Sequence, residues 1–101
     1  MKIKNLVGRK VIIRTYSAGC WFGTLSEKKR NEVVITDARR LWRWHAAEGI
    51  SLSGVARAGI KHDDSRIEQA VDAVWLEAIE IIPCTDPAIA SIESAPNATP
   101  C

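Results

Sequence analysis

Apolar and polar positions in the first half of the chain follow the two-residue period of β-strands. Residues 10–16 are rich in β-branched side chains, and Val11 and Ile13 alternate with Ile12 and Arg14. The small residues 17–19 that follow are typical of a turn. The pattern therefore predicts a strand over 10–16 that ends in a tight turn.

Three further strands are expected before residue 45. Gly23 interrupts the first of them, which predicts a bulge or a close approach of two backbones at that point. The charged residues after it predict a turn. The expected strands are 20–25, 32–36 and 38–44, with a charged turn over 26–31 and a tight connection at Thr36 and Asp37.

The pattern changes after residue 50. Ser51 or Ser53 is a suitable N-cap for a short helix over residues 52–58, and Gly59 is a typical end signal. A second helix is expected to begin with Asp86 as its N-cap and proline in its first turn.

Residues 67–82 fit two interpretations. Ile67, Val71 and Val74 have helical spacing, whereas residues 79–82 read as a strand. We favour strand structure for most of this region, with a break near residues 75–77.

Together these elements predict an α+β fold. We expect a small, strongly bent, antiparallel sheet of five or six strands, partly barrel-like, with two short helices. The length of 101 residues fits one domain, which we place at residues 1–95, and the proline- and asparagine-containing residues 96–101 are expected to be a disordered tail.

Composition narrows the protein classes. The chain is 47% apolar, but its apolar runs are far shorter than the roughly 18 residues of a membrane-spanning helix. Its first residues lack the apolar stretch of a signal peptide. A cytoplasmic protein with reduced thiols is therefore expected.

Charge is unevenly distributed along the chain. Residues 1–45 hold 11 Lys and Arg but 3 Asp and Glu, whereas residues 46–101 hold 3 and 9. Five of the six aromatic residues also lie in the first half. Basic and aromatic side chains together suit a ligand with phosphates and flat bases, although core tryptophans and surface arginines would give the same composition.

Catalytic and metal-binding patterns are weak. The three cysteines have no CxxC spacing, and no phosphate-binding glycine motif is present. His45 is best interpreted as a polar edge residue, and residues 62–64 as a solvated loop rather than a cation site. We therefore expect no catalysis, no metal and no cofactor.

Residues 39–44 place arginines on both faces of a predicted strand and two tryptophans on one of them. Arg39 and Arg43 alternate with Arg40, Trp42 and Trp44. Neither a core strand nor a solvated strand carries such a mixture. The segment is therefore expected to form the wall of a cleft or an interface.

Two motifs resemble a known family. Residues 14–19 (Arg-Thr-Tyr-Ser-Ala-Gly), followed by Phe22 and Gly23, resemble the first motif of the Thoeris anti-defence family of phage proteins. Residues 38–44 followed by Ser-Leu-Ser resemble its second motif, and the C-terminal region is also similar. The resemblance spans most of residues 5–93.

The resemblance implies a sequestering protein that is not an enzyme. Such proteins act in the cytoplasm of the infected bacterium, where they hold the glycosyl-cyclic ADP-ribose signal of TIR-domain enzymes without degrading it. Some also hold cyclic di- or trinucleotides. They form homodimers, or hexamers built from dimers, with pockets between protomers, and neither membrane nor DNA is a partner.

The matched motifs supply the candidate ligand-binding residues. Substitution of Arg39 or Arg40 by Ala is expected to weaken ligand binding and leave the fold intact. The candidates are Arg14, Thr15, Tyr16, Ser17, Ala18, Gly19, Phe22, Arg39, Arg40, Trp42, Arg43 and Trp44.

Two other classes remain open. Residues 6–13 followed by Gly-Thr-Leu at 23–25 resemble the start of an Sm-like RNA-binding module, which also forms rings. The loop after Leu25 lacks the Asp/Asn pattern of nucleobase binding, and the usual later Arg-Gly pair is absent. A structural or regulatory phage protein without a ligand is the third class.

Overall fold

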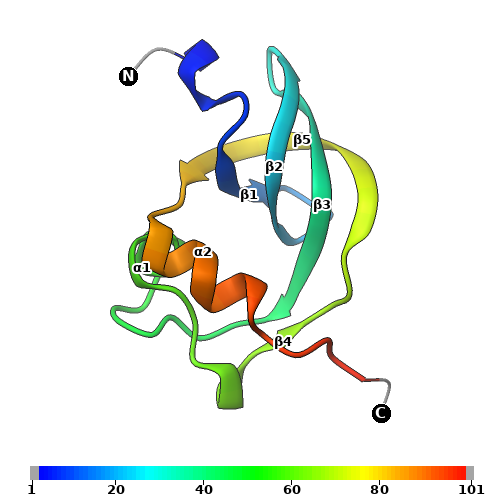
Figure 1. Ribbon diagram of the computed structural model, residues 1–101. Coiled ribbons are helices and arrows are strands. Elements are labelled where there is room, and N and C mark those ends of the chain that lie inside the picture. Colours follow the sequence, from blue (N-terminus) through cyan, green and yellow to red (C-terminus); the bar gives the residue numbers. More distant parts are fainter. Residues whose placement is uncertain (1–2, 100–101) are drawn as a thin grey trace.

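The computed structural model describes residues 3–99. They contain five strands, two α-helices and two short 3-10 helices (Figure 1). The elements in chain order are η1 (Ile3–Leu6), β1 (Lys10–Thr15), β2 (Cys20–Lys29), β3 (Glu32–Arg43), α1 (Leu52–Ala58), η2 (His62–Asp64), β4 (Arg66–Ile67), β5 (Val71–Pro83) and α2 (Asp86–Glu93).

The antiparallel strands close into a ring of hydrogen bonds. Their order is β2-β1-β5-β3-β4, and β2 also pairs with β3, so that β1, β5, β3 and β2 form a continuous circuit. Figure 1 shows both helices packed against one side of this ring. The predicted α+β class and the bent antiparallel sheet are confirmed.

Alternation along β1 divides the core into two layers. Val11 and Ile13 belong to a cluster of strand side chains that also contains Ile35. Ile12 points to the other face, where it joins Phe22 and the buried residues of α1 and α2. The two faces of one strand thus hold the ring together and attach the helices to it.

The two helices begin differently. Ser51 and Gly59 flank α1, as the sequence predicts, but the Ser51 side chain makes no capping hydrogen bond, whereas Gly59 has a φ of 91° that favours glycine. The predicted N-cap of α2, Asp86, is wrong. Thr85 is the N-cap, because its Oγ1 accepts a hydrogen bond from the backbone N–H of Ala88 (3.3 Å).

β3 is one strand, and the predicted connection at Thr36 and Asp37 is wrong. Asp37 adopts a φ of 48°, which bends the strand without ending it. Close packing accompanies this bend, since a Cβ on Gly23 would lie 2.8 Å from the carbonyl oxygen of Thr36. The pairing of β2 with β3 shifts there, and the extra residue lies on β3 opposite Gly23, so of the two predicted alternatives the close approach at Gly23 is confirmed.

Two other boundaries differ from the sequence prediction. β5 runs unbroken through residues 75–77, because these residues pair with β3. The interruption lies earlier, at residues 68–70, between β4 and β5. β2 continues to Lys29, which confines the expected charged turn to Arg30 and Asn31.

The segment after α2 returns to the sheet. Asn97 forms a parallel bridge with Ile67, and the N–H of Ala98 donates to the carbonyl of Ile67 at 2.8 Å. Residues 96–99 of the expected disordered tail are therefore held beside β4. The remainder of that tail, residues 100–101, lies outside the described residues.

Candidate functional site

The predicted site residues do not form a single cluster. Thr15 and Phe22 are buried, and Phe22 is only 1% exposed. Thr15 Oγ1 donates to the carbonyl of Gly19 (2.7 Å) and accepts from the N–H of Ala18 (2.8 Å), which fixes the turn between β1 and β2. These two side chains build the fold and leave little free surface for a ligand.

Arg39 is also a structural residue. Its side chain is buried, with 7% of the residue exposed, and all three guanidinium nitrogens donate hydrogen bonds. The acceptors are the carbonyl oxygens of Glu68 (2.9 Å), Ile92 (2.8 Å), Ala95 (3.0 Å) and Ile67 (3.3 Å), and Asn97 Oδ1 (2.9 Å). Burial lowers the pKa of Arg39. Contrary to the expectation from the sequence, we therefore expect Arg39→Ala to destabilise the fold.

Arg40 lies opposite Trp21 in the pairing of β2 with β3 and contacts the turn between β1 and β2. Its guanidinium lies over the ring of Trp21, 4.3 Å from the centroid. Arg40 Nη1 (2.9 Å) and Trp21 Nε1 (3.0 Å) both donate to the carbonyl of Ala18. A longer ion pair joins Arg40 to Glu68 at 3.6 Å. The Arg40 side chain is thus half-exposed, but its guanidinium already contacts Trp21, Ala18 and Glu68.

Two of the predicted residues meet at a hollow beside α1, which we call the Arg14 hollow. Arg14 comes from β1, and Trp44 from the segment that follows β3. The hollow has a volume of about 350 Å³ and is lined by Arg14, Cys20, Trp44, Ser51, Leu52, Ser53 and Glu80.

The chemistry of the Arg14 hollow is mixed. Arg14 Nε donates to Glu80 Oε1 at 2.9 Å, and within residues 3–99 no acceptor is bonded to Arg14 Nη1 or Nη2. Trp44 packs against the helical core and presents a flat wall, and buried Leu52 supplies an apolar surface. The arrangement offers cationic donors, hydroxyls and an aromatic face in one place.

Cys20 lies in the same hollow but is a poor nucleophile. Burial is the largest cause of its raised pKa, the cation of Arg14 acts in the opposite direction, and the carboxylate of Glu80 adds to the rise. At neutral pH the group is therefore a protonated thiol, which serves as a small apolar lining residue.

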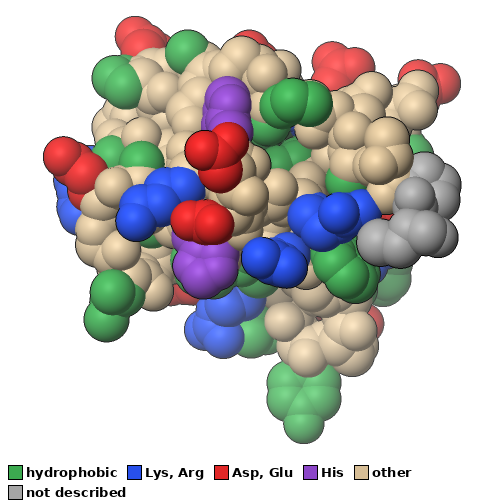
Figure 2. Space-filling model, turned by 90° about the horizontal axis from the view of Figure 1, so that it is seen from below, with side chains coloured by type: hydrophobic (Ala, Val, Ile, Leu, Met, Phe, Trp, Pro, Cys, Tyr) green, Lys and Arg blue, Asp and Glu red, His purple; other side chains and the backbone are tan. Residues whose placement is uncertain are grey.

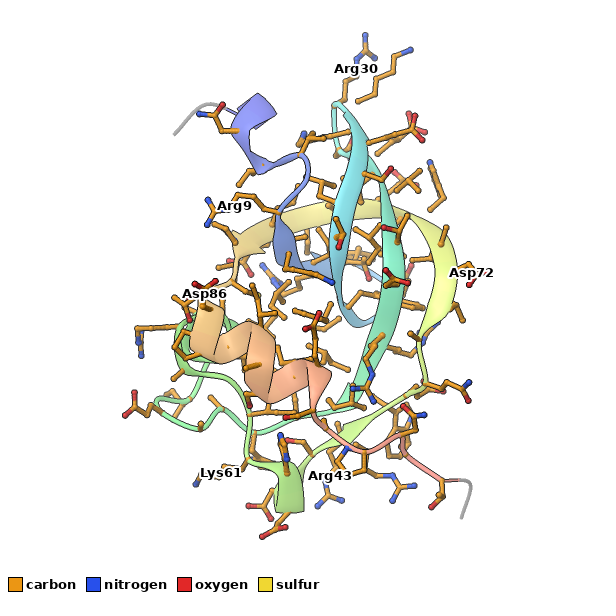
Figure 3. All side chains as sticks on the ribbon, viewed as in Figure 1. Arg9, Arg30, Arg43, Lys61, Asp72 and Asp86 are labelled. Atoms are coloured by element: carbon orange, nitrogen blue, oxygen red, sulfur yellow. The ribbon has the colours of Figure 1, made fainter. Side chains whose placement is uncertain are left out.

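Trp42 and Arg43 lie apart from this hollow, at the end of β3. Trp42 is 63% exposed, and the guanidinium of Arg66 lies 5.7 Å from its ring centroid. Figure 3 shows Arg30 and Arg43 at opposite ends of β3. The view from below in Figure 2 shows Lys and Arg side chains beside Asp, Glu and His. The charge asymmetry of the sequence does not produce a purely basic face there.

The residues of the β1–β2 turn line a second hollow, which we call the Trp75 groove. It has a volume of about 350 Å³ and is lined by Thr15, Tyr16, Ser17, Ala18, Asn31, Trp75, Leu76, Glu77 and Ile79. Gly19, with a φ of 81°, completes the turn and does not line the groove.

Sequence reasoning missed several lining residues. It used Ser51 and Ser53 as helix caps and as part of the second family motif, and it did not place Glu77 or Glu80 in a site. Trp75 carried a signal, since it is the one aromatic residue in the acidic half of the chain. Tyr16, which lines the same groove, is distant in sequence, so the sequence alone did not connect them.

The fold and its hollows define a small α+β domain in which a closed ring of strands is covered on one side by two helices. The chain belongs to the DUF6948 family, a domain of unknown function, whose family model matches residues 8–92. No curated protein and no solved structure matches it. Neither helix in residues 3–99 is of the length and apolarity that crossing a bilayer requires.

Proposed function

We propose that this protein binds a cyclic ADP-ribose-type signal in the Arg14 hollow and holds it without turnover. The supporting observation is that Arg14 and Trp44 line one hollow together with two serine residues. The resemblance of residues 14–19 and 38–44 to the Thoeris anti-defence family supplies the ligand class. In this proposal the protein removes a glycosyl-cyclic ADP-ribose from the cytoplasm of an infected bacterium and thereby blocks anti-phage immunity.

Each part of such a ligand has a suitable counterpart. The pyrophosphate would accept hydrogen bonds from the Nη1 and Nη2 groups of Arg14, because Glu80 occupies only Nε. The adenine would lie against Trp44, and ribose hydroxyls would reach Ser51 and Ser53. Glu80 would hold the guanidinium in place and partly offset its charge.

The size of the hollow favours assembly. Its volume of about 350 Å³ is near the lower end of the roughly 300–1,000 Å³ found for sites that enclose most of a drug-sized ligand. Tight retention at nanomolar concentration requires about 12 kcal/mol of binding free energy. A second copy of the chain over the ligand would supply the missing contacts, in a homodimer or in a hexamer built from dimers. Cyclic di- or trinucleotides are further candidate ligands.

Ligand capture tests the proposal directly. The protein is purified from cells that produce the TIR-derived signal, denatured by heat, and the released small molecules are identified by mass spectrometry. Intact cyclic ADP-ribose-type signal is the expected result. A hydrolysed product would overturn sequestration, and an empty protein would overturn binding.

Matched variants locate the site. Arg14→Ala and Trp44→Ala are each expected to lower the captured amount by roughly tenfold or more, the equivalent of about 1.4 kcal/mol. Arg9→Ala is the control, because it removes one exposed arginine outside the hollow. Equal loss in Arg9→Ala and Arg14→Ala would indicate a general charge effect and would contradict the assignment.

Single-stranded RNA remains the second candidate, as in the Sm-like alternative. The observation that favours it is Trp42, which is 63% exposed beside Arg66 and can stack on a base. RNA in the captured material, lost in Trp42→Ala but retained in Arg14→Ala, would support this function over the cyclic nucleotide.

A further inference from the structure

The Trp75 groove has a different chemistry from the Arg14 hollow and needs a different ligand. Three large apolar side chains stand exposed around it: Tyr16 (92%), Trp75 (55%) and Ile79 (51%). Buried Leu76 also contributes to its lining. Exposed aromatic side chains that converge on a hollow are typical of binding surfaces.

The main aromatic wall is held in place before any ligand arrives. Trp75 Nε1 donates to Glu32 Oε1 at 3.2 Å, so the indole is tied to the neighbouring strand β3. On the other side, the hydrogen bonds of Thr15 fix the turn that carries Tyr16. A preformed wall reduces the conformational entropy that binding must overcome.

The charge of the groove selects a cation. Among its lining residues Glu77 is the one carboxylate, and no Lys or Arg lines it. Within the described residues Glu77 has no ion-pair partner, and its side chain is exposed. A phosphate would be repelled here, whereas a lysine or arginine of a partner would be attracted.

The high exposure of its aromatic side chains favours an extended peptide over an enclosed small molecule. Sites for small ligands bury about 70–90% of the ligand surface, and a tyrosine that is 92% exposed covers too little for that. A polyproline II segment binds by laying its rings across several aromatic faces. Its backbone stays solvated and already ordered, so it needs no backbone partner from the protein.

We infer that the Trp75 groove binds a proline-rich peptide segment in which a Lys or Arg meets Glu77 while prolines pack against Tyr16 and Trp75. This interaction is independent of the proposed nucleotide binding, because the two hollows share no residue. It assigns the exposed aromatic residue of the acidic half to a protein partner.

The test is a titration of the full-length protein, labelled with ¹⁵N, with a synthetic blocked peptide that contains two Pro-x-x-Pro repeats and one Arg. The expected result is a saturable shift of the Trp75 indole N–H signal while the Trp42 indole signal stays unchanged. Replacement of the prolines by Ala in the peptide is expected to weaken binding roughly tenfold.

A charge exchange separates this groove from adventitious binding. Glu77→Lys is expected to bind the Arg-containing peptide roughly tenfold more weakly. It should prefer the same peptide with Glu in place of Arg. Glu77 is exposed, so this variant should fold normally. Trp75→Ala should weaken peptide binding at least as much. Trp42→Ala is the matched control and should bind the peptide as the wild type does.

Three results would overturn the inference. They are the absence of an indole shift at Trp75, equal affinity for the proline-free peptide, and a Glu77→Lys variant that keeps its preference for Arg. Self-association would also overturn it. If no peptide binds and sedimentation shows that Trp75→Ala converts a dimer into a monomer, the groove is an interface between two copies of the chain. Loss of ligand capture in Arg14→Ala bears only on the nucleotide proposal.

Discussion

Arg39 on β3 donates from Nη1 to the carbonyl oxygen of Ile92 in the last turn of α2, at 2.8 Å. The same nitrogen reaches Ala95 just beyond the helix at 3.0 Å. A cation at the C-terminal end of a helix stabilises the carbonyl groups that the helix leaves without partners. The bond explains how a charged residue is accommodated beneath the helix.

Arg39→Ala is expected to destabilise the protein. It would leave buried carbonyl oxygens without donors, and the free energy of unfolding should fall by about 3 kcal/mol. Urea denaturation followed by circular dichroism measures the change. Arg43→Ala, on the exposed end of the same strand, should stay within about 0.5 kcal/mol of the wild type. Equal stability of both variants would contradict the structural role of Arg39.

Removal of the Arg40 guanidinium should loosen the turn between β1 and β2. Arg40→Ala loses both the contact with Trp21 and the hydrogen bond to Ala18, which together should lower stability by about 1–2 kcal/mol. Hydrogen exchange at residues 16–19 should accelerate more than exchange in α1. Uniform acceleration over the whole chain would argue against this local effect.

Gly23 should tolerate no side chain. A Cβ there would meet the carbonyl oxygen of Thr36 at 2.8 Å, so Gly23→Ala must displace the backbone of β3 and should cost roughly 2 kcal/mol or more. Gly8→Ala is the matched control. Its Cβ would meet nothing within 4 Å, so only the φ of 91° opposes the substitution. The free energy of unfolding should fall by roughly 1 kcal/mol. Thermal denaturation of the two variants distinguishes a steric clash from backbone strain.

Cys84 makes the fold sensitive to alkaline pH. Burial raises the pKa of its thiol to about 12, well above the roughly 8.5 of an unfolded cysteine. The unfolded chain therefore releases this proton first, so the stabilisation is complete below about pH 8.5 and is lost as the pH rises toward 12. In denaturation curves over this range, Cys84→Ala should show a shallower fall in stability than the wild type. Parallel curves would contradict the assignment.

Local signals in the sequence were sufficient for several elements. The alternation after Lys10 identified β1, and the serine and glycine at its ends delimited α1. Gly23 marked the closest approach of two strands. These features depend on neighbouring residues, and a short window of sequence contains them.

Features that depend on distant partners were not recoverable in the same way. β3 stays continuous at Asp37 because β2 and β5 pair on either side of the bend, and nothing local indicates this support. Arg39 resembled a ligand-binding arginine, since its acceptors lie 28 to 58 residues away in the sequence. Some motif residues are therefore structural and others are exposed, and only the folded structure shows which is which.

The pairing of β1 with β5 also constrains how the chain folds during synthesis. Val11 lies opposite Pro83, so one edge of β1 stays open until nearly the whole domain has left the ribosome. Hairpins of β1 with β2 and of β2 with β3 can form earlier from local contacts. The nascent chain thus carries an uncovered strand edge until β5 has been synthesised and pairs with β1.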